Sequence, residues 1–294
     1  MIINLKYYVI TIIAIFLAIG IGIFIGIMLD GQDLIVEQQQ QLVSQLQSKF
    51  DEFKAKQDEL QERIDYLSGE REKNIKFIEK VYPHIVHNKL KDLDVAIIET
   101  NEEYSYVGLN DALEKAGVQS ISSIYIKSNF ILKDLNYAQQ LSNELNISGD
   151  TLDEIQNQLV QLFCNAMISG HYQTINSFKE KGLIDYIDKP KLPVDYLVIA
   201  GGSSTDERSI LKKIDIPIIT KVKSNGVPIM AVEKTNVAHS NIQDYKKVRV
   251  STVDNVDTVI GKVSMMMVLS GQEGHFGEKQ TAEALVPEGF LSID

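Results

Sequence analysis

The chain has 294 residues, of which 44% are hydrophobic and 23% are charged, so it is long enough to bury a core. Its formal net charge of −11 argues against nucleic-acid binding and against adhesion to an anionic lipid surface, because both need clustered Lys and Arg. Its single cysteine, Cys164, excludes an intrachain disulfide.

The first element is an apolar run from Tyr7 to Leu29 that contains no charged residue. A helix needs ~20 apolar residues to cross a bilayer core, so this run predicts a transmembrane helix over residues 7–29. A cleaved signal peptide would have a shorter apolar region and a small-x-small cleavage site, and the sequence after Leu29 has no such site. We therefore expect an uncleaved membrane anchor.

The charges beside this anchor predict its orientation. Lys6 precedes the apolar run, whereas Asp30 and Asp33 follow it. The positive-inside rule then places residues 1–6 in the cytoplasm and nearly all of the chain outside it. The expected location is the cell membrane, as a single-pass protein whose bulk is extracytoplasmic.

Four small residues recur at every fourth position of the anchor and so lie on one line of the helix. Such a line lets a second helix approach closely in lipid, and it predicts pairing of two membrane helices. The alternative is that Gly and Ala are simply common in membrane helices. The four residues are Ala14, Ala18, Gly22 and Gly26.

A heptad pattern follows the anchor, with Val36 at position a and most a and d positions apolar as far as Val81. This pattern predicts a coiled coil over residues 34–82, which ends at Tyr82 and Pro83 because proline breaks the helical hydrogen-bond ladder. The expected core is formed by Val43, Leu46, Phe50, Phe53, Leu60, Ile64 and Leu67.

The partner of this coil is left open between two possibilities. Basic residues at the flanking e and g positions would repel one another mildly in a parallel homodimer, although Glu52 and Glu59 offer neutralisation by Lys56 and Arg63 within each helix. We expect a homodimer, and the alternative is a different helix with acidic e and g positions. The basic residues are Lys49, Lys54, Lys56 and Arg63.

From residue 88 onward the periodicity changes to short apolar runs that alternate with helical patterns. This alternation predicts an extracytoplasmic α/β domain with a mostly parallel sheet over residues 88–294. We expect strands at 94–100, 121–126 and 195–201, helices at 108–116, 135–145, 151–169, 172–181, 206–214 and 256–269, and short pieces of either kind at 217–223, 227–232 and 247–251.

The N-terminal pattern NLKYYVITIIAIFLAIGIGIFIG, the Gln/Glu-rich coil, the proline after it and the Gly-rich GHFGE near the end together resemble the MctB family. Its members, from actinobacteria and firmicutes, are named as copper transporters. The resemblance covers essentially the whole architecture and is most specific at residues 17–26. It implies a role in copper homeostasis at the cell envelope, and some relatives are instead associated with cell-envelope separation. It implies no catalytic residues.

Copper has two weak candidate sites in the sequence and no evident path through the span. Cys164, Met167 and His171 would share one helix face if the helix continued past Gly170, and they are soft ligands suited to Cu(I). The alternative is that Cys164 and Met167 are ordinary core residues. His84 and His87 form the second candidate site, with two surface histidines as its alternative.

The span itself offers almost no copper ligands. Thr11 and the two tyrosines at its start are its polar side chains, and Met28 lies at its far end. A single helix encloses no pore, so we do not expect the chain to conduct copper by itself. Three consecutive methionines, at 265–267, point in different directions on a helix and are expected to fill a core.

The segment Gly201, Gly202, Ser203, Ser204 and Thr205 lies between an expected strand and an expected helix. Backbone N–H groups in such a turn can hold a small anionic ligand, although a tight turn with Ser/Thr capping explains the same residues. The sequence lacks the motifs of a phosphate-binding loop or a hydrolase, so we expect no enzyme.

The sequence therefore predicts a membrane-anchored envelope protein with a single N-terminal transmembrane helix, a coiled-coil stalk and an α/β domain. Its expected role is in copper homeostasis or copper transport, as a scaffold or binding module. The first alternative is an envelope or division scaffold that has another membrane-associated partner and no copper role. The second alternative is a domain that binds a small anionic ligand at residues 201–205.

Overall fold

The computed structural model describes residues 5–205 and 208–288. Residues 1–4 of the expected cytoplasmic segment, residues 206–207 of the expected 206–214 helix and residues 289–294 lie outside these ranges. The chain divides into two compact units, Met1–Ile75 and Lys76–Asp294, and each is described by itself.

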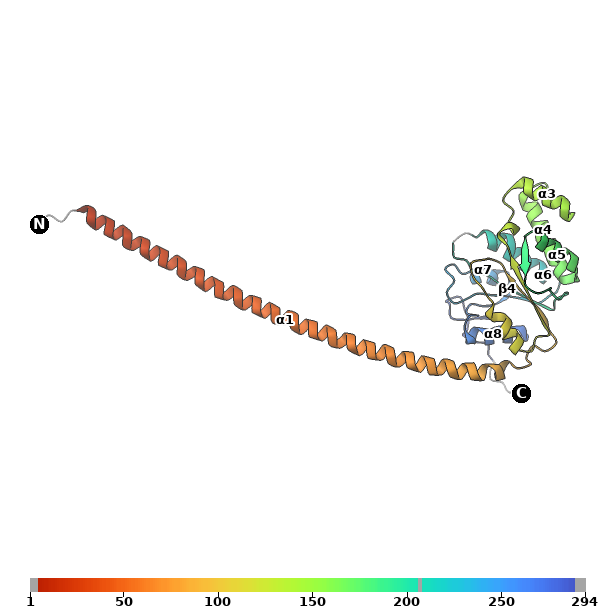
Figure 1. Cartoon of the computed structure of the whole chain (residues 1–294), viewed down its shortest axis with the longest axis horizontal. Coiled ribbons are helices and arrows are strands. Elements are labelled where there is room, and N and C mark those ends of the chain that lie inside the picture. Colours follow the sequence, from red (N-terminus) through yellow and green to blue (C-terminus); the bar gives the residue numbers. More distant parts are fainter. Residues whose placement is uncertain (1–4, 206–207, 289–294) are drawn as a thin grey trace. The chain divides into compact units, whose positions relative to one another are not determined.

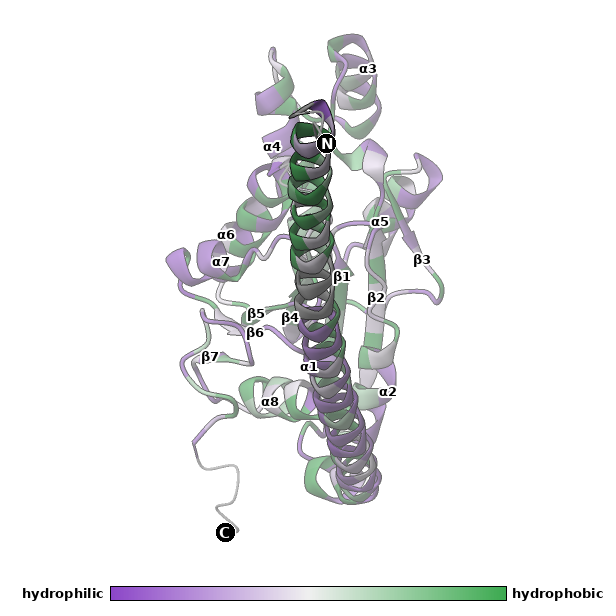
Figure 2. Cartoon of the chain, turned by 90° about the vertical axis from the view of Figure 1, so that its left-hand side faces the viewer, coloured by the Kyte–Doolittle hydropathy of each residue, from purple (hydrophilic) through white to green (hydrophobic). Residues whose placement is uncertain are grey.

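The described part of the first unit, residues 5–75, belongs to one long helix, α1, which runs from Leu5 to Val86. Its segment Lys6–Met28 is long and apolar enough to cross a membrane. Figure 2 shows this apolar part of α1 in green and the later part mostly in purple. The structure thus confirms an N-terminal apolar helix that is followed by further helix and by an α/β domain.

The helix ends about one turn later than the sequence predicts. Pro83 lies inside α1, which continues to Val86. The missing N–H of Pro83 removes one helical hydrogen bond. Tyr82 and Val86 are only 5% and 1% exposed, because they belong to the core of the second unit, and their burial stabilises this last turn.

Seven strands of the second unit form one sheet in the order β3-β2-β1-β4-β5-β6-β7, and every neighbouring pair is parallel except β2 with β3. In the register of the central strands, Ile98 lies opposite Ile124 on one side and Ile199 on the other. The predicted, mostly parallel sheet is confirmed. The strands are β1 (Asp94–Glu99), β2 (Ser120–Ile126), β3 (Ile184–Tyr186), β4 (Tyr196–Ala200), β5 (Ile229–Val232), β6 (Ser251–Val253) and β7 (His275–Phe276).

Helices cover both faces of this sheet. Successive residues of a strand point to opposite faces, and here the residues on both faces are apolar and buried. Ala96 and Ile98 of β1 pack in a core with α3, α4, α5, α6 and α7, whereas Val95 and Ile97 pack in a second core with the end of α1, α2 and α8. The helices are α2 (Gly108–Lys115), α3 (Leu135–Leu145), α4 (Leu152–Ser169), α5 (Tyr172–Glu180), α6 (Ile216–Ser224), α7 (Ile242–Lys247) and α8 (Val259–Leu269), with a 3₁₀ turn at Ser128–Phe130 and a π-helix at Leu211–Asp215.

Several elements differ from the predictions. The expected separate pieces at 206–214 and 217–223 form continuous helical structure from residue 209 to residue 224. The strands β3 and β7 and the helix α7 were not predicted. The expected helix at 256–269 begins at Val259, because the Thr258 side chain accepts a hydrogen bond from the Gly261 N–H at 3.0 Å and caps it there.

Candidate functional site

The carboxyl ends of β1 and β4 form the topological switch point of the sheet. The chain leaves β1 to form β2 on one side and later adds β4 on the other side. Ligands of doubly wound sheets usually bind in the crevice at this point. The Gly201–Thr205 turn follows β4, and the segment 101–106 follows β1, so both lie at this crevice.

A carboxylate of the chain itself occupies the predicted anion position in the Gly201–Thr205 turn. The Ser204 N–H donates to Glu103 Oε2 at 2.6 Å, and the Ser203 hydroxyl lies 3.4 Å from the same oxygen. The hydrogen bond from the Ser204 backbone lowers the pKa of Glu103 below its ordinary value. An external anion would therefore have to displace Glu103 from this N–H group.

Other side chains of the segment 101–106 also bind the turn. Tyr106 donates its hydroxyl to the Gly201 carbonyl at 2.5 Å, and Tyr104 donates to the Ser203 carbonyl at 3.3 Å. Asn101 donates to the Gly202 carbonyl and accepts from the backbone of its own segment. The chain's own polar side chains therefore bind the turn at the switch point.

A small polar cavity of about 180 Å³ remains beside the turn. Ser203, Thr205, Ser240 and Asn241 contribute to its lining, together with Arg208. Arg208 Nη1 lies 3.0 Å from Asp244 Oδ2, so its charge is already paired. The cavity can hold only a small polar molecule.

Two buried carboxyl groups near the same edge were missed by sequence reasoning. Glu99 is 5% exposed, and burial raises its pKa to about 7. Asp215 is fully buried, and burial raises its pKa to about 6. Its Oδ2 accepts a hydrogen bond from the Tyr245 hydroxyl, whereas its Oδ1 has no partner among the described residues. No motif marks these residues in the sequence, because burial comes from tertiary packing.

Hydrogen bonds join the Gly-rich GHFGE segment to the same edge of the sheet. Asp254, at the end of β6, accepts the N–H groups of Glu278 at 2.8 Å and Lys279 at 3.1 Å. Lys279 Nζ also forms an ion pair at 2.8 Å with the fully buried Glu233. A Cβ added at Gly277 would lie 1.9 Å from Asp254 Oδ1, so the close approach requires glycine.

The first candidate copper site is divided between two helices. α4 ends at Ser169, with Gly170 in a left-handed conformation at φ 75°, and His171 precedes α5. Cys164 and Met167 are 1% and 0% exposed in the core, and burial raises the pKa of the Cys164 thiol to about 12. Thiolate formation, which metal binding requires, is therefore opposed by burial.

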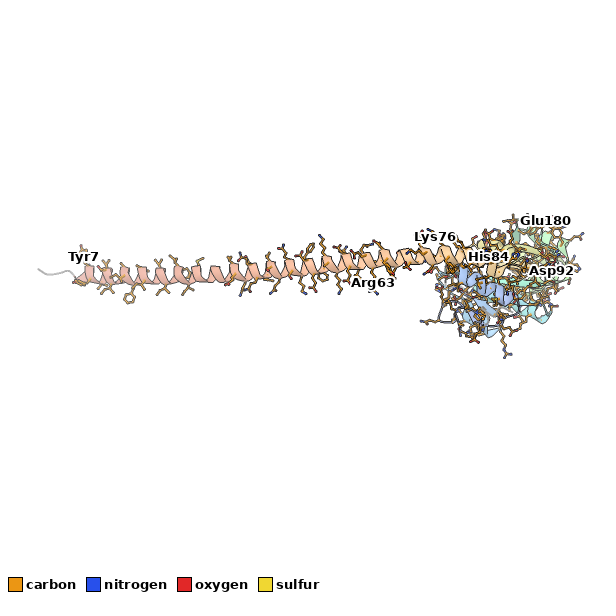
Figure 3. The ribbon with its side chains drawn as sticks, turned by 90° about the horizontal axis from the view of Figure 1, so that it is seen from below. Tyr7, Arg63, Lys76, His84, Asp92 and Glu180 are labelled. Carbon is orange, nitrogen blue, oxygen red and sulfur yellow. The ribbon has the colours of Figure 1, made fainter. Side chains whose placement is uncertain are left out.

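The second candidate copper site is at the surface. His84 lies in the last turn of α1, where Figure 3 labels it, and His87 lies just beyond the helix. Both are exposed, and His87 Nε2 is 3.0 Å from Asn88 Nδ2. Within residues 5–205 and 208–288, no three His, Cys, Asp or Glu residues gather in a way that could hold a metal ion. Met265 and Met266 are buried in the core, as expected.

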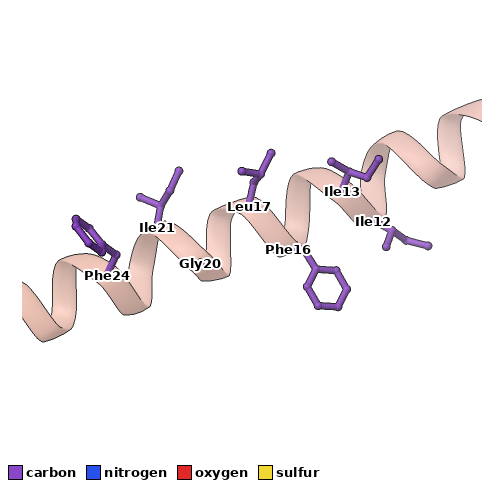
Figure 4. A pocket seen from close by; sticks show the side chains of 7 residues that line it. All are labelled: Ile12, Ile13, Phe16, Leu17, Gly20, Ile21 and Phe24. Carbon is purple, nitrogen blue, oxygen red and sulfur yellow. The ribbon is translucent and has the colours of Figure 1, made fainter.

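The membrane-length part of α1 has glycines on two of its sides. Gly22 and Gly26 of the predicted pairing line have open space where a Cβ would lie, and so does Gly20 on the opposite face. Figure 4 shows Gly20 without a side chain among larger neighbours such as Phe16 and Phe24. The structure contains one chain, so the pairing of two such helices stays a prediction.

The predicted coiled-coil core is an exposed stripe on the single chain. Its seven residues, Val43 to Leu67 as given above, are between 54% and 74% exposed. Lys49 Nζ lies 2.8 Å from Glu52 Oε2, so a basic g position is neutralised within the helix by a different pair from the predicted Glu52 and Lys56. The stripe has no partner among the described residues.

Comparison with known proteins gives one result on the family. No curated protein matches the chain. A family described as "Copper transport outer membrane protein, MctB" matches residues 2–287, which is nearly the whole chain. The match spans the apolar helix, the long helix and the α/β domain, and it agrees with the resemblance seen in the sequence. The chain therefore belongs to the MctB family, a family of copper-transport-related membrane proteins.

Proposed function

We propose that this MctB-family chain is a stalked membrane scaffold or binding module that acts in copper homeostasis without conducting copper through its own span. In this proposal, two copies pair in parallel through the membrane helix and the coil. Residues 1–6 lie in the cytoplasm, and the α/β domain lies outside it. The observation that carries the proposal is the exposed apolar stripe from Val43 to Leu67, on the same helix as the apolar segment Lys6–Met28.

The stripe supports pairing because its residues repeat with heptad spacing along a helix that is otherwise polar. A lone helix would leave this stripe in water, and knobs-into-holes packing with a second helix would bury it. A second copy is the simplest partner, since anchoring in the same membrane with the same orientation makes its helix parallel. At ~1.5 Å per residue, residues 36–81 form a helix about 70 Å long, which suits a spacer.

The orientation rests on Lys6 before the span and the two aspartates after it. The copper role rests on the family description. A passive role in transport is supported by the span itself, because one helix encloses no pore and its only soft Cu(I) ligand is Met28 at its far end. The scaffold would then present its α/β domain to copper-handling partners.

We further infer that the α/β domain is not catalytic. Support comes from the switch point, where Glu103, Tyr104 and Tyr106 form hydrogen bonds with the Gly201–Thr205 turn. The anionic-ligand alternative keeps one supporting observation, the polar cavity of about 180 Å³ beside Ser203. A ligand there would be small and would compete with Glu103.

Disulfide cross-linking tests the homodimer. In the full chain in membranes, with Cys164→Ser as background, Leu60→Cys places a thiol at a central d position, where two parallel helices meet. We expect covalent dimers after mild oxidation. Glu62→Cys, at an outer f position of the same heptad, is the matched control and should cross-link far less. Equal cross-linking of both variants, or none at Leu60→Cys, would contradict the parallel homodimer.

Cell-associated copper tests the biological role. A deletion strain grown in moderately elevated copper should accumulate a different amount of copper from the parent strain, and the full chain should restore the parental amount. A chain with Phe50→Asp and Phe53→Asp, which places charges in the coil, should fail to restore it. Unchanged copper after deletion would instead favour the envelope or division scaffold without a copper role.

A further inference from the structure

The apolar side of α1 is exposed in one part of the helix and covered in another. The seven predicted core residues of the coil, Val43 to Leu67, are all more than half exposed. Counting on in sevens from Val43 places Ile78 and Ile85 at a and Val81 at d, and these three residues are only half-buried or less exposed than the stripe. The same heptad side of one helix therefore has different surroundings before and after residue 76.

Helix α8 of the same chain faces this side in the second unit. The a and d residues of α1 at this level line an apolar groove of about 210 Å³, together with Val259 and Val263 of α8. Tyr82 and Val86, in the same turns of α1, are buried in a core to which Val263 also belongs. A parallel partner helix that packed against these a and d positions would need the space that α8 occupies.

Two polar residues interrupt the apolar stripe just before this level. Arg71 lies at a and Asn74 at d, and both are exposed. In a parallel dimer, each a residue packs beside the same residue of the other helix, so two Arg71 guanidinium groups of like charge would meet in the interface. Gln57 is also polar, but it is uncharged and lies alone between the apolar residues Phe53 and Leu60.

We propose that the two helices of the homodimer separate after Leu67, and that α8 of each chain takes the place of the partner helix from Ile78 onward. Only the first part of the predicted coil then pairs, and each α/β unit lies outside the coil interface. Separation at this point exposes no apolar a or d residue, because Arg71 and Asn74 are the two positions that lose their partner. This inference rests on the proposed parallel homodimer.

Distances between spin labels test the separation. In the Cys164→Ser full chain in lipid vesicles, one label is attached to each copy at Glu59→Cys or at Lys80→Cys. Both residues are exposed and occupy c positions three heptads apart, so a continuous parallel coil gives the same distance at both. We expect the distance at residue 80 to be longer by at least ~10 Å, the diameter of one further helix.

The two positions also separate this inference from the proposal on which it rests. Equal distances at residues 59 and 80 would overturn the inference and leave the homodimer standing. If neither position shows coupling between the labels of two copies, the parallel homodimer itself fails, and the inference fails with it.

Disulfide formation at successive d positions gives the second test. A disulfide needs Cβ atoms ~3.5–4.5 Å apart, so it reports on close helices only. In the same background, Leu67→Cys should form covalent dimers after mild oxidation, and Asn74→Cys should form at least tenfold fewer. Because Asn74 is exposed, both thiols should react equally with a maleimide, which controls for access. Equal cross-linking at the two positions would overturn the inference.

Discussion

Alanine at Gly277 should release the GHFGE segment from the edge of the sheet. Gly277 has φ +140°, a conformation that costs a residue with a side chain about 1–3 kcal/mol. The new Cβ would also lie 1.9 Å from Oδ1 and 2.3 Å from Cγ of Asp254. The buried carboxylate would have to move and lose at least one hydrogen bond from Glu278 or Lys279, each worth roughly 1.5–3 kcal/mol.

These two contributions sum to roughly 2.5–6 kcal/mol against local attachment of the segment. Hydrogen exchange of the full chain in detergent can measure the change at the Glu278 and Lys279 amides. A loss of about 3 kcal/mol corresponds to roughly a hundredfold loss of protection. Global spectroscopy is less suitable, because the signal of the 82-residue helix α1 would dominate it.

Gly271→Ala is the matched control for this prediction. Gly271 also has a positive φ, at +105°, but a Cβ there would meet nothing within 4 Å. It should therefore carry the conformational cost alone and leave the two amides protected. If Gly277→Ala lowers protection at Glu278 and Lys279 no more than Gly271→Ala does, the proposed contact with Asp254 does not hold this segment.

Three further predictions follow from the buried and paired groups. Cys164→Ala should leave the Cu(I) affinity of the full chain unchanged in a chelator competition, because the thiol is buried and its pKa is raised to about 12; a lower affinity would restore the α4 copper site. Asp215 and Glu99 have folded-state pKa values of about 6 and 7, above their ordinary values, so their contribution to stability is complete below about pH 4 and is lost as pH rises to 7. Asp215→Asn should flatten this loss in denaturation curves measured from pH 4.5 to 7, and an unchanged slope would contradict the assignment. Glu103→Ala should free the Ser204 N–H, so that inorganic phosphate raises the melting temperature of the variant but not of the parent chain; no difference between them would show that the turn does not bind anions even when it is open.

The sequence predicted the elements whose signal lies within a short stretch. A pattern of apolar residues within a short window marks each of these elements. They are the apolar run after Lys6, the heptads and the buried strands β1, β2 and β4. The strands β3 and β7 have three and two residues, too few for a pattern, and they form only because β2 and β6 offer free edges. Pro83 was expected to end the helix, but the burial of Tyr82 and Val86 outweighs the local preference of proline.

The site was less predictable than the fold. The Gly201–Thr205 turn was correctly placed between a strand and a helical segment, yet its occupant, Glu103, lies about a hundred residues earlier in the chain. Likewise, the partners of Asp254 come from the C-terminal segment. Such contacts depend on how strands are ordered in the sheet, and no local pattern in the sequence encodes that order.

The burial of Tyr82 and Val86 also bears on how the long helix forms. Nucleation of a helix in water has an equilibrium constant of ~10⁻³, which is a free-energy cost of about 4 kcal/mol. Adding each further residue changes the free energy very little. The folded α/β unit fixes the last turn of α1 in its core and so provides a ready nucleus. Helix can grow from this turn along the polar segment toward the membrane before any second copy arrives. Folding of the globular unit would thus prepare the stalk for pairing.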